Sequence, residues 1–238
     1  MNKLPVKTSL LALALLGLGA CSDSDNLPPP PPEPPTPPVV MKSFEVTVTN
    51  LTANQPMSPL ALISHNDDIK LWQISESASV ALEQLAEGGD STGFDTISGV
   101  DALVRGAGIL PPGMSETLML TLAENKVDAL SLLTMLVNTN DAFSGFNAMD
   151  IESMENGASN SLRLMAYDAG TEANSEAKGS IPGPADGGEG FNAARDDVNR
   201  VHVHPGVISQ DDGLADSVLH TSHRFDNPVL KVTITRTE

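Results

Sequence analysis

Apolar and polar residues alternate along several short segments of the chain. In residues 44–50, FEVTVTN, apolar side chains take every second position, and residues 230–236, LKVTITR, repeat this pattern. An alternation with a period of two places the apolar side chains on one face of a β-strand. Because the first and last such segments both have the pattern of half-buried strands, we expect them to pair within one sheet and close the fold.

The segments between these two strands predict further strands. Residues 115–122 alternate, and residues 129–137 form a nearly continuous apolar run. The turn candidate at 124–128 predicts that these two segments form a hairpin that enters the centre of a sheet. Residues 161–168 and 199–206 predict two more strands.

One segment predicts a helix and another predicts a long loop. Residues 77–89 have an apolar face with helical spacing, with Ser77 as the N-cap and Gly88 at the position after the C-terminus. Residues 170–198 are rich in Gly, Pro, Asn, Glu and Asp. We expect this segment to be a surface loop, and loops of this length are usually functional or mobile.

The first 20 residues have the features of a secretory signal peptide. Lys3 and Lys7 form a positive region, and residues 9–20 form an apolar run that ends in small residues. This run is shorter than the roughly 20 residues that a membrane-spanning helix needs, and polar residues follow it directly. We therefore expect residues 1–20 to be removed during secretion.

A lipid attachment site follows the apolar run. Leu18, Gly19 and Ala20 precede Cys21, a pattern that looks like the lipobox at which bacteria acylate a cysteine and cleave just before it. Cys21 is the only cysteine, so a disulfide within the chain is excluded. The alternative is an ordinary signal peptide followed by a chance cysteine. By resemblance to the bacterial sorting rule, Ser22 favours delivery to the outer membrane, with the protein either periplasmic or surface-exposed.

A proline-rich segment separates this cysteine from the rest of the chain. Residues 28–38, PPPPPEPPTPP, predict a polyproline II rod. At about 3.1 Å per residue, the rod spans on the order of 34 Å. We expect a signal peptide at 1–20, a lipidated linker at 21–40 and one domain at 41–238, which is large enough to form a core without disulfides.

Acidic residues dominate the charge. The chain has 31 Asp and Glu against 13 Lys and Arg, and loss of the signal peptide removes two lysines and leaves a formal charge of −20. Because phosphate binding needs a basic surface, we expect no nucleic acid partner. Acidity also keeps a secreted protein soluble, and it makes divalent cations the natural inorganic partners.

Seven segments together resemble the spondin N-terminal family, a β-sandwich module that also occurs in bacterial secreted proteins. They are FEVTVTNLT (44–52), ALISHND (61–67), LWQISESAS (71–79), LEQLAEGGD (82–90), TNDAFSGFNAMDI (139–151), YDAGTEANSE (167–176) and NPVLKVTITR (227–236). The most specific pieces are TNDAFSGFN and YDAGTEAN. The resemblance spans essentially all of residues 42–238.

This resemblance implies a fold and a metal site. The fold is an all-β, C2-like antiparallel β-sandwich of about eight strands with one short helix, and the metal is calcium (Ca2+), held by acidic loops at one end. The Asp of the family's S/T-x-Asp-x-F segment falls on Asp141, and the two acids of its D-A-G-T-D/E segment fall on Asp168 and Glu172. Animal members have Asp where this chain has Glu172. An upstream acidic ligand of some members has no placed counterpart, since Glu124 would need a shift of register.

The residues support this chemistry without the family. Calcium takes six to eight oxygen ligands, many of them from carboxylates and backbone carbonyls. Asp141 and Asp168 each follow a predicted strand, and Gly170 lets the chain turn tightly toward Glu172. Three carboxylates in one place would repel each other without a cation. The alternative is that both aspartates only accept hydrogen bonds from nearby backbone N–H groups.

The histidines offer a second kind of metal site. His202 and His204 are two apart on a predicted strand and could ligate zinc or iron, as in cupin-like sandwiches. The alternation of this strand instead predicts that Val201 and Val203 point inward and that both histidines face solvent.

No catalytic signature is present in the sequence. It has no G-x-S-x-G elbow, no H-E-x-x-H pair and no phosphate-binding glycine loop, so we expect no enzyme. We expect a cell-envelope lipoprotein that binds calcium and mediates extracellular binding or adhesion to an unknown protein or glycan, as the animal relatives imply. Two alternatives stay open: a cupin-like histidine-metal enzyme and a metal-free structural envelope lipoprotein.

Overall fold

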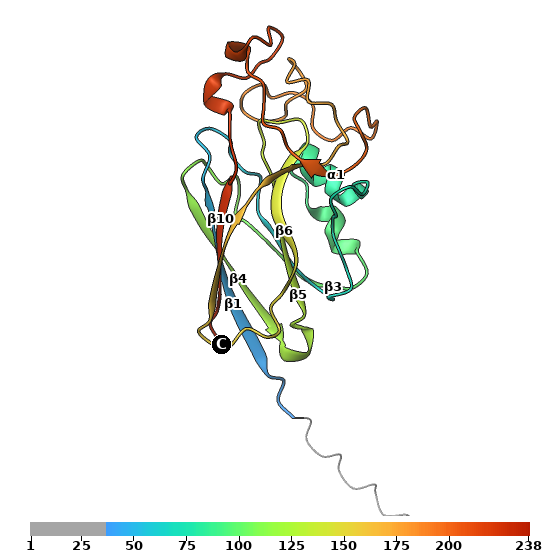
Figure 1. Cartoon of the computed structure of the whole chain (residues 1–238). Helices are drawn as coiled ribbons and strands as arrows, with labels where there is room; N and C mark the ends of the chain where they lie inside the picture. The colour runs from blue at the N-terminus through green and yellow to red at the C-terminus, as the bar shows by residue number, and fades with distance from the viewer. Residues whose placement is uncertain (1–36) are drawn as a thin grey trace, which may run out of the picture. The chain divides into compact units, whose positions relative to one another are not determined.

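The first and last strands of the domain lie side by side. The computed structural model describes residues 37–238. β1 (Met41–Asn50) and β10 (Leu230–Arg236) pair antiparallel, from Phe44 opposite Arg236 to Asn50 opposite Leu230 (Figure 1). This confirms the expected pairing of the two ends of the fold. The predicted signal peptide, Cys21 and most of the proline-rich linker lie outside the described residues and stay predictions.

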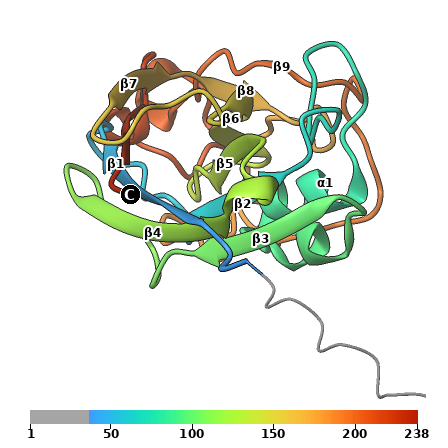
Figure 2. The ribbon, with the colours of Figure 1, turned by 90° about the horizontal axis from the view of Figure 1, so that it is seen from below.

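Within residues 37–238, ten strands form two antiparallel sheets that face each other (Figure 2). The first sheet has the order β4-β1-β10-β7, and the second has the order β3-β2-β5-β6-β8-β9. The remaining strands are β2 (Ala61–His65), β3 (Val100–Arg105), β4 (Ser115–Ala123), β5 (Ala129–Met135), β6 (Ala142–Asp150), β7 (Ser159–Leu164), β8 (Ala166–Asp168) and β9 (His202–Val203). The predicted antiparallel β-sandwich is confirmed.

Apolar side chains fill the space between the sheets and also cover the outer face of the second sheet. Val46 of β1 and Leu132 of β5 belong to the core between the sheets. On the other face of β5, Leu133 packs in a second cluster with Leu85 of α1 (Val80–Gly88). Since both faces of β5 are covered, every residue of this strand is buried, which explains its nearly continuous apolar sequence.

The predicted helix is confirmed with slightly later boundaries. Ser79, rather than Ser77, caps α1 by accepting a hydrogen bond from the Leu82 N–H (3.2 Å). Gly89, with φ of 70°, ends the helix. Short 3-10 turns lie at Thr92–Thr96, Glu124–Lys126, Gln210–Asp212 and Thr221–His223. In the described part of the chain, no helix has the length and apolar character needed to cross a membrane.

Two connections that were expected to stay within one sheet cross between the sheets. The predicted hairpin of residues 115–122 with 129–137 is wrong, because β4 pairs with β1 while β5 pairs with β2 and β6. The predicted strand at 161–168 is in fact two strands, β7 and β8, which belong to different sheets. An alternating pattern predicts which side chains are buried, but it does not identify the partner strand.

Gly145 of β6 provides a test of the packing between β6 and β5. A Cβ atom at Gly145 would overlap the carbonyl oxygen of Leu132 on the neighbouring strand. We expect Gly145→Ala to destabilise the domain by about 1–3 kcal/mol, because an overpacked site forces the backbone to shift. In thermal unfolding this corresponds to a fall of roughly 2–12 °C. Gly108→Ala is the matched control, since a Cβ there has no neighbour within 4 Å; equal melting of the two variants would contradict the expectation.

Candidate metal centre

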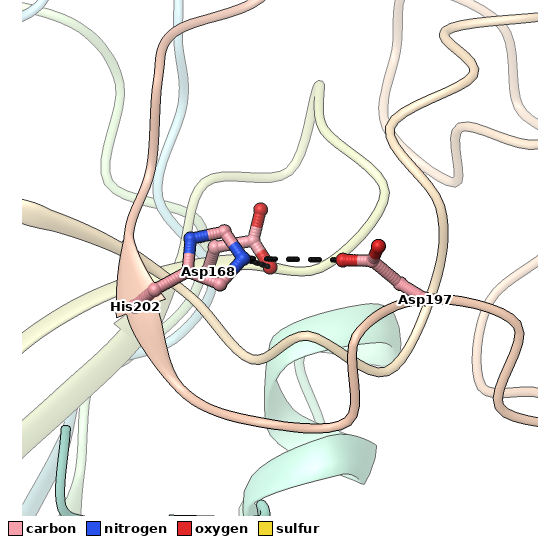
Figure 3. Close-up of side chains that lie close together, drawn as sticks. All are labelled: Asp168, Asp197 and His202. Atoms are coloured by element: carbon pink, nitrogen blue, oxygen red, sulfur yellow. Dashed lines mark ion pairs between the residues drawn. The ribbon is translucent and has the colours of Figure 1, made fainter. Parts of the chain in front are cut away.

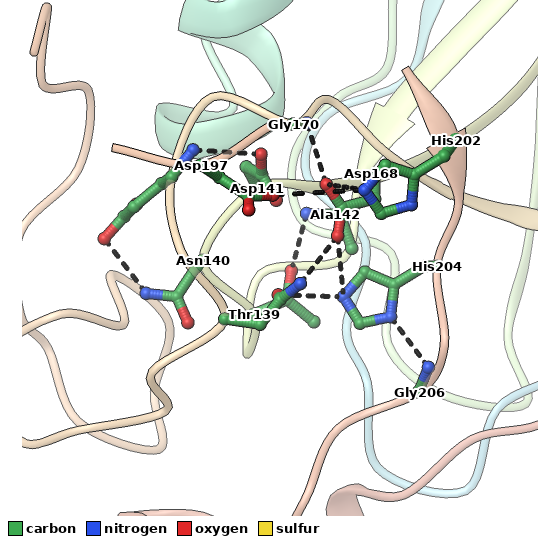
Figure 4. Close-up of polar contacts among 12 residues, drawn as sticks. Thr139, Asn140, Asp141, Ala142, Asp168, Gly170, Asp197, His202, His204 and Gly206 are labelled. Carbon is green, nitrogen blue, oxygen red and sulfur yellow. Dashed lines mark hydrogen bonds and ion pairs between the residues drawn. The ribbon is translucent and has the colours of Figure 1, made fainter. Parts of the chain in front are cut away.

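The pairing of β6 with β8 brings two predicted ligands together at one end of the sandwich. Ala142, the first residue of β6, lies opposite Asp168, the last residue of β8. Asp141 directly precedes β6, so the two aspartates are neighbours across the end of the sheet (Figure 4). The Thr139 hydroxyl shapes the loop before β6: it donates to the Leu136 carbonyl (2.6 Å) and accepts from the Ala142 N–H (3.1 Å).

Asp141 has a fully buried carboxylate, and within residues 37–238 only one of its two oxygens accepts hydrogen bonds. Its Oδ2 accepts hydrogen bonds from the N–H groups of Thr171 (2.8 Å) and Glu172 (3.2 Å) and from the Thr171 hydroxyl (3.2 Å). Its Oδ1 is buried and has no hydrogen-bond partner among the described residues. Burial, and then the negative charge of Asp168, raise the pKa of Asp141 to about 8. The expected hydrogen bonds from backbone N–H groups are present, but they leave half of the carboxylate unsatisfied.

Asp168 is also fully buried, and both of its oxygens accept hydrogen bonds. Its Oδ1 accepts from the Gly170 N–H (2.7 Å), and its Oδ2 accepts from the Asn174 side-chain amide (2.6 Å). Gly170 has a φ of 68°, and a Cβ there would overlap the backbone of Arg200. The tight turn predicted at Gly170 is therefore confirmed, and only glycine fits it.

Glu172 follows this turn but faces a different group of side chains. Its Oε1 accepts a hydrogen bond from the side-chain amide of Asn140 (2.9 Å). The pKa of Glu172 is raised to about 7: burial is the main cause, the hydrogen bond from Asn140 opposes the rise, and the negative charge of Glu87 adds to it. The structure thus brings Asp141 and Asp168 together, while it places the Glu172 carboxylate toward α1.

Glu87 of α1 is an acidic neighbour of this site that the sequence did not single out. It is buried; its Oε2 accepts from the Asn192 N–H (2.8 Å), and its Oε1 has no partner among the described residues. Burial raises the pKa of Glu87, although the Asn192 amide and the Thr171 side chain oppose the rise. Glu87 therefore lies near Thr171, whose amide and hydroxyl bind Asp141. The only signal in the sequence was an acid on the helix, with no pattern to mark it as buried.

His202, Asp197 and Asp168 form a second acidic group beside the first (Figure 3). One ligand atom from each of these residues lies within 4.8 Å of the other two, and within residues 37–238 no other set of three His, Cys, Asp or Glu side chains meets this criterion. The His202 Nε2 lies 3.4 Å from Asp168 Oδ1 and 3.9 Å from Asp197 Oδ2. Asp197 lies in the predicted surface loop, where nothing in the sequence distinguishes it from its acidic neighbours.

The expected orientation of the histidine strand is partly wrong. Val201 is buried as predicted, but Val203 is 43% exposed and His204 is only 3% exposed. The regular strand is only two residues long, so the alternation is lost after His202. Burial lowers the pKa of His204 to about 4, although nearby Asp168 opposes this effect. His204 is therefore neutral at physiological pH.

An ion pair anchors the loop that carries Asp197. The Arg195 guanidinium donates to both carboxylate oxygens of buried Glu83 on α1 (2.9 and 2.7 Å) and to the Ala78 carbonyl (2.8 Å). It also donates to the side chain of Asn199 (2.7 Å). This bidentate ion pair fixes the loop that carries Asp197 on α1, because two parallel hydrogen bonds between arginine and a carboxylate define one geometry.

These features define a class of protein: an antiparallel β-sandwich module with acidic side chains buried among the loops at one end. The family model described as Spondin_N matches residues 49–180, more than half of the chain. The chain therefore belongs to the spondin N-terminal family, as the resemblance of its segments indicated, and this family membership points to a secreted, extracellular domain. No curated protein matches the chain. The matched range includes Glu87 and the three predicted ligands, whereas Asp197 and both histidines lie beyond it.

The buried carboxylate of Asp141 makes a prediction about pH. The raised pKa means that the folded protein keeps a proton that the unfolded chain releases between pH 3.8 and about 8. In chelator-treated protein, the free energy of unfolding should therefore fall as the pH rises through this interval. We expect a lower melting temperature at about pH 8 than at about pH 5, and a smaller difference in Asp141→Asn. Asp216→Asn, at an exposed position, is the control; an unchanged slope in Asp141→Asn would rule out Asp141 as its source.

Proposed function

We propose that this domain binds calcium at its acidic end. The bound ion would order the loops there, and these loops would present a surface to an extracellular protein or glycan. The observation that carries the proposal is the unpartnered Oδ1 of Asp141, a buried carboxylate oxygen next to a second buried carboxylate, Asp168. An unpaired buried carboxylate is unfavourable. A divalent cation removes both the unsatisfied acceptor and the repulsion between the two acids.

The donor chemistry of the site suits calcium. Asp141, Asp168, Glu172 and Glu87 supply only oxygen atoms, which is the ligand type that calcium prefers. The unpartnered Oε1 of Glu87 is a second buried acceptor, and Glu87 lies close enough to Glu172 for its charge to raise the pKa of Glu172. Glu172 would join the ion by exchanging its hydrogen bond with Asn140 for a metal bond.

Calcium in this position would act first on structure. The four acids come from α1, the loop before β6, the end of β8 and the loop that follows β8. A bound ion would tie these segments to one point and so fix the long loop between β8 and β9. This supports a role in binding or adhesion, because an ordered loop surface is the usual recognition element on a rigid sandwich.

Calcium should stabilise the folded protein. At a calcium concentration about 100 times the dissociation constant, the gain is about 2.7 kcal/mol, which raises the melting temperature by roughly 5–11 °C. Asp141→Asn should lose this rise, because the amide nitrogen takes the place of a ligand oxygen. The single tryptophan, Trp72, packs 4.6 Å from the ring of Tyr167, which precedes Asp168, so its fluorescence should also respond to calcium in the wild type.

Asp216→Asn removes the same charge from an exposed position and should keep the full calcium response. If Asp141→Asn and Asp216→Asn respond equally, calcium binds elsewhere on this acidic protein. If the wild type does not respond at all, the domain does not bind calcium and the proposed calcium function is wrong.

The proposal includes an outer-membrane anchor at Cys21, followed by the proline-rich linker. Cys21→Ser removes the thiol that accepts the lipid, so we expect the protein to move from the membrane fraction to the soluble fraction of the cell envelope. Fractionation followed by immunoblotting measures this change. Ser22→Ala is the control, because it leaves the thiol in place; membrane association that survives in Cys21→Ser would contradict lipid anchoring.

A further inference from the structure

The ring of His202 is held in one orientation by a backbone carbonyl. Its Nδ1 lies 3.1 Å from the carbonyl oxygen of Val203. A carbonyl oxygen only accepts hydrogen bonds, so the Nδ1 carries a proton and donates it. In the neutral ring, the Nε2 then has a free electron pair. Histidines that bind metals through one nitrogen commonly donate the other N–H to a backbone carbonyl in this way.

The free nitrogen of His202 faces two carboxylate oxygens. These are Oδ1 of Asp168 at 3.4 Å and Oδ2 of Asp197 at 3.9 Å. Three electron-pair donors thus converge on one point from β8, from the loop and from β9 (Figure 3). Zinc bonds of 2.0–2.1 Å in a tetrahedral arrangement separate neighbouring ligand atoms by roughly 3.3 Å. The distance between His202 and Asp168 is close to this value, and it is longer than the usual charged N–H···O bond of about 2.8 Å.

His204 has the opposite arrangement. Its Nδ1 accepts a hydrogen bond from the Gly206 N–H (2.9 Å), so the neutral ring carries its proton on Nε2. That Nε2–H donates to the Asn174 side-chain oxygen (3.2 Å), and the Asn174 amide in turn donates to Asp168 (2.6 Å). His204 is therefore a positioning residue that fixes Asp168 through Asn174, and it offers no free nitrogen to an ion.

We infer that Asp168, Asp197 and His202 form a site for a divalent transition metal of the zinc class, separate from the calcium ligands except for Asp168. One nitrogen and two carboxylate oxygens form a mixed donor set, which suits zinc, cobalt or manganese, whereas calcium prefers oxygen alone. The side chains of His202 and Asp197 are 32% and 23% exposed, so an ion has access from solvent and water completes its coordination. Arg195, bound to α1, holds the segment that carries Asp197.

Zinc titration of the full-length chain tests the inference. All variants carry Cys21→Ser, because a free thiol binds zinc. Isothermal titration with zinc chloride should reveal one site, and His202→Ala and Asp197→Asn should each weaken it at least tenfold. Cobalt should give the visible absorption of a nitrogen- and oxygen-ligated ion, and zinc should shift the Nε2 nitrogen resonance of His202. The matched control is His220→Ala, because His220 also lies beside a carboxylate, Asp211, at 3.6 Å, but has no second one.

The outcomes separate this site from the calcium site. Asp141→Asn should abolish calcium binding and leave zinc binding unchanged. If wild-type protein binds zinc but not calcium, only the proposed calcium function fails and the zinc site stands. The inference is overturned if no zinc binds, if His202→Ala binds as tightly as the parent, if His220→Ala weakens binding equally, or if Asp141→Asn removes both metals. It is also overturned if the His202 ring carries protons on both nitrogens in the presence of zinc.

Discussion

Two aspartates without solvent access stand next to each other where β6 begins and β8 ends. Transfer of a carboxylate out of water is unfavourable unless hydrogen bonds, a proton or a cation compensate for it. Around Asp141 and Asp168 the compensation is mostly local: backbone N–H groups of the 170–172 turn and the Asn174 amide point at them. The turn after β8 supplies most of these donors, and the remaining unpaired oxygen of Asp141 is the basis of the proposed cation site.

The long segment between β8 and β9 is held by a few apolar contacts and by polar contacts to α1. Ala169 and Val201, at its two ends, join the core cluster on the outer face of the second sheet. Between them, Ile181 packs with Val207 and Leu219 in a small cluster separate from the main cores. Most of its other contacts are polar, such as Arg195 with Glu83 and Asn192 with Glu87. A segment held in this way is sensitive to the charge state of the acids beneath it. Protonation at the site, or binding of the proposed ion, would therefore change the conformation of this segment.

The sequence predicted the sandwich, the pairing of its first and last strands and the helix, because alternation and capping are local signals. The crossings between sheets after β4 and at Met165 could not be foreseen, since partner choice depends on the whole fold. At the site, the resemblance to the spondin N-terminal family identified Asp141, Asp168 and Glu172, and the structure places the first two together. Glu87 and Asp197 were missed because their burial and proximity arise only when α1 and the long loop pack against the sheet ends.

The N- and C-terminal ends of the domain both lie at the end of the sandwich opposite the buried aspartates. The amide of Ser43 bonds the carbonyl of Glu238, whereas the far end of β1, at Asn50, approaches the loop before β6 through Gln55 (Figure 1). A force applied between a ligand at the acidic loops and the proposed lipid anchor, which precedes Met41 in the chain, would act along the length of β1. The ladders that join β1 to β4 and β10 would then be loaded in shear, with all their hydrogen bonds sharing the force, rather than opened one rung at a time. If the proposed anchor and the proposed ligand site act together, the domain would therefore resist force along its strands.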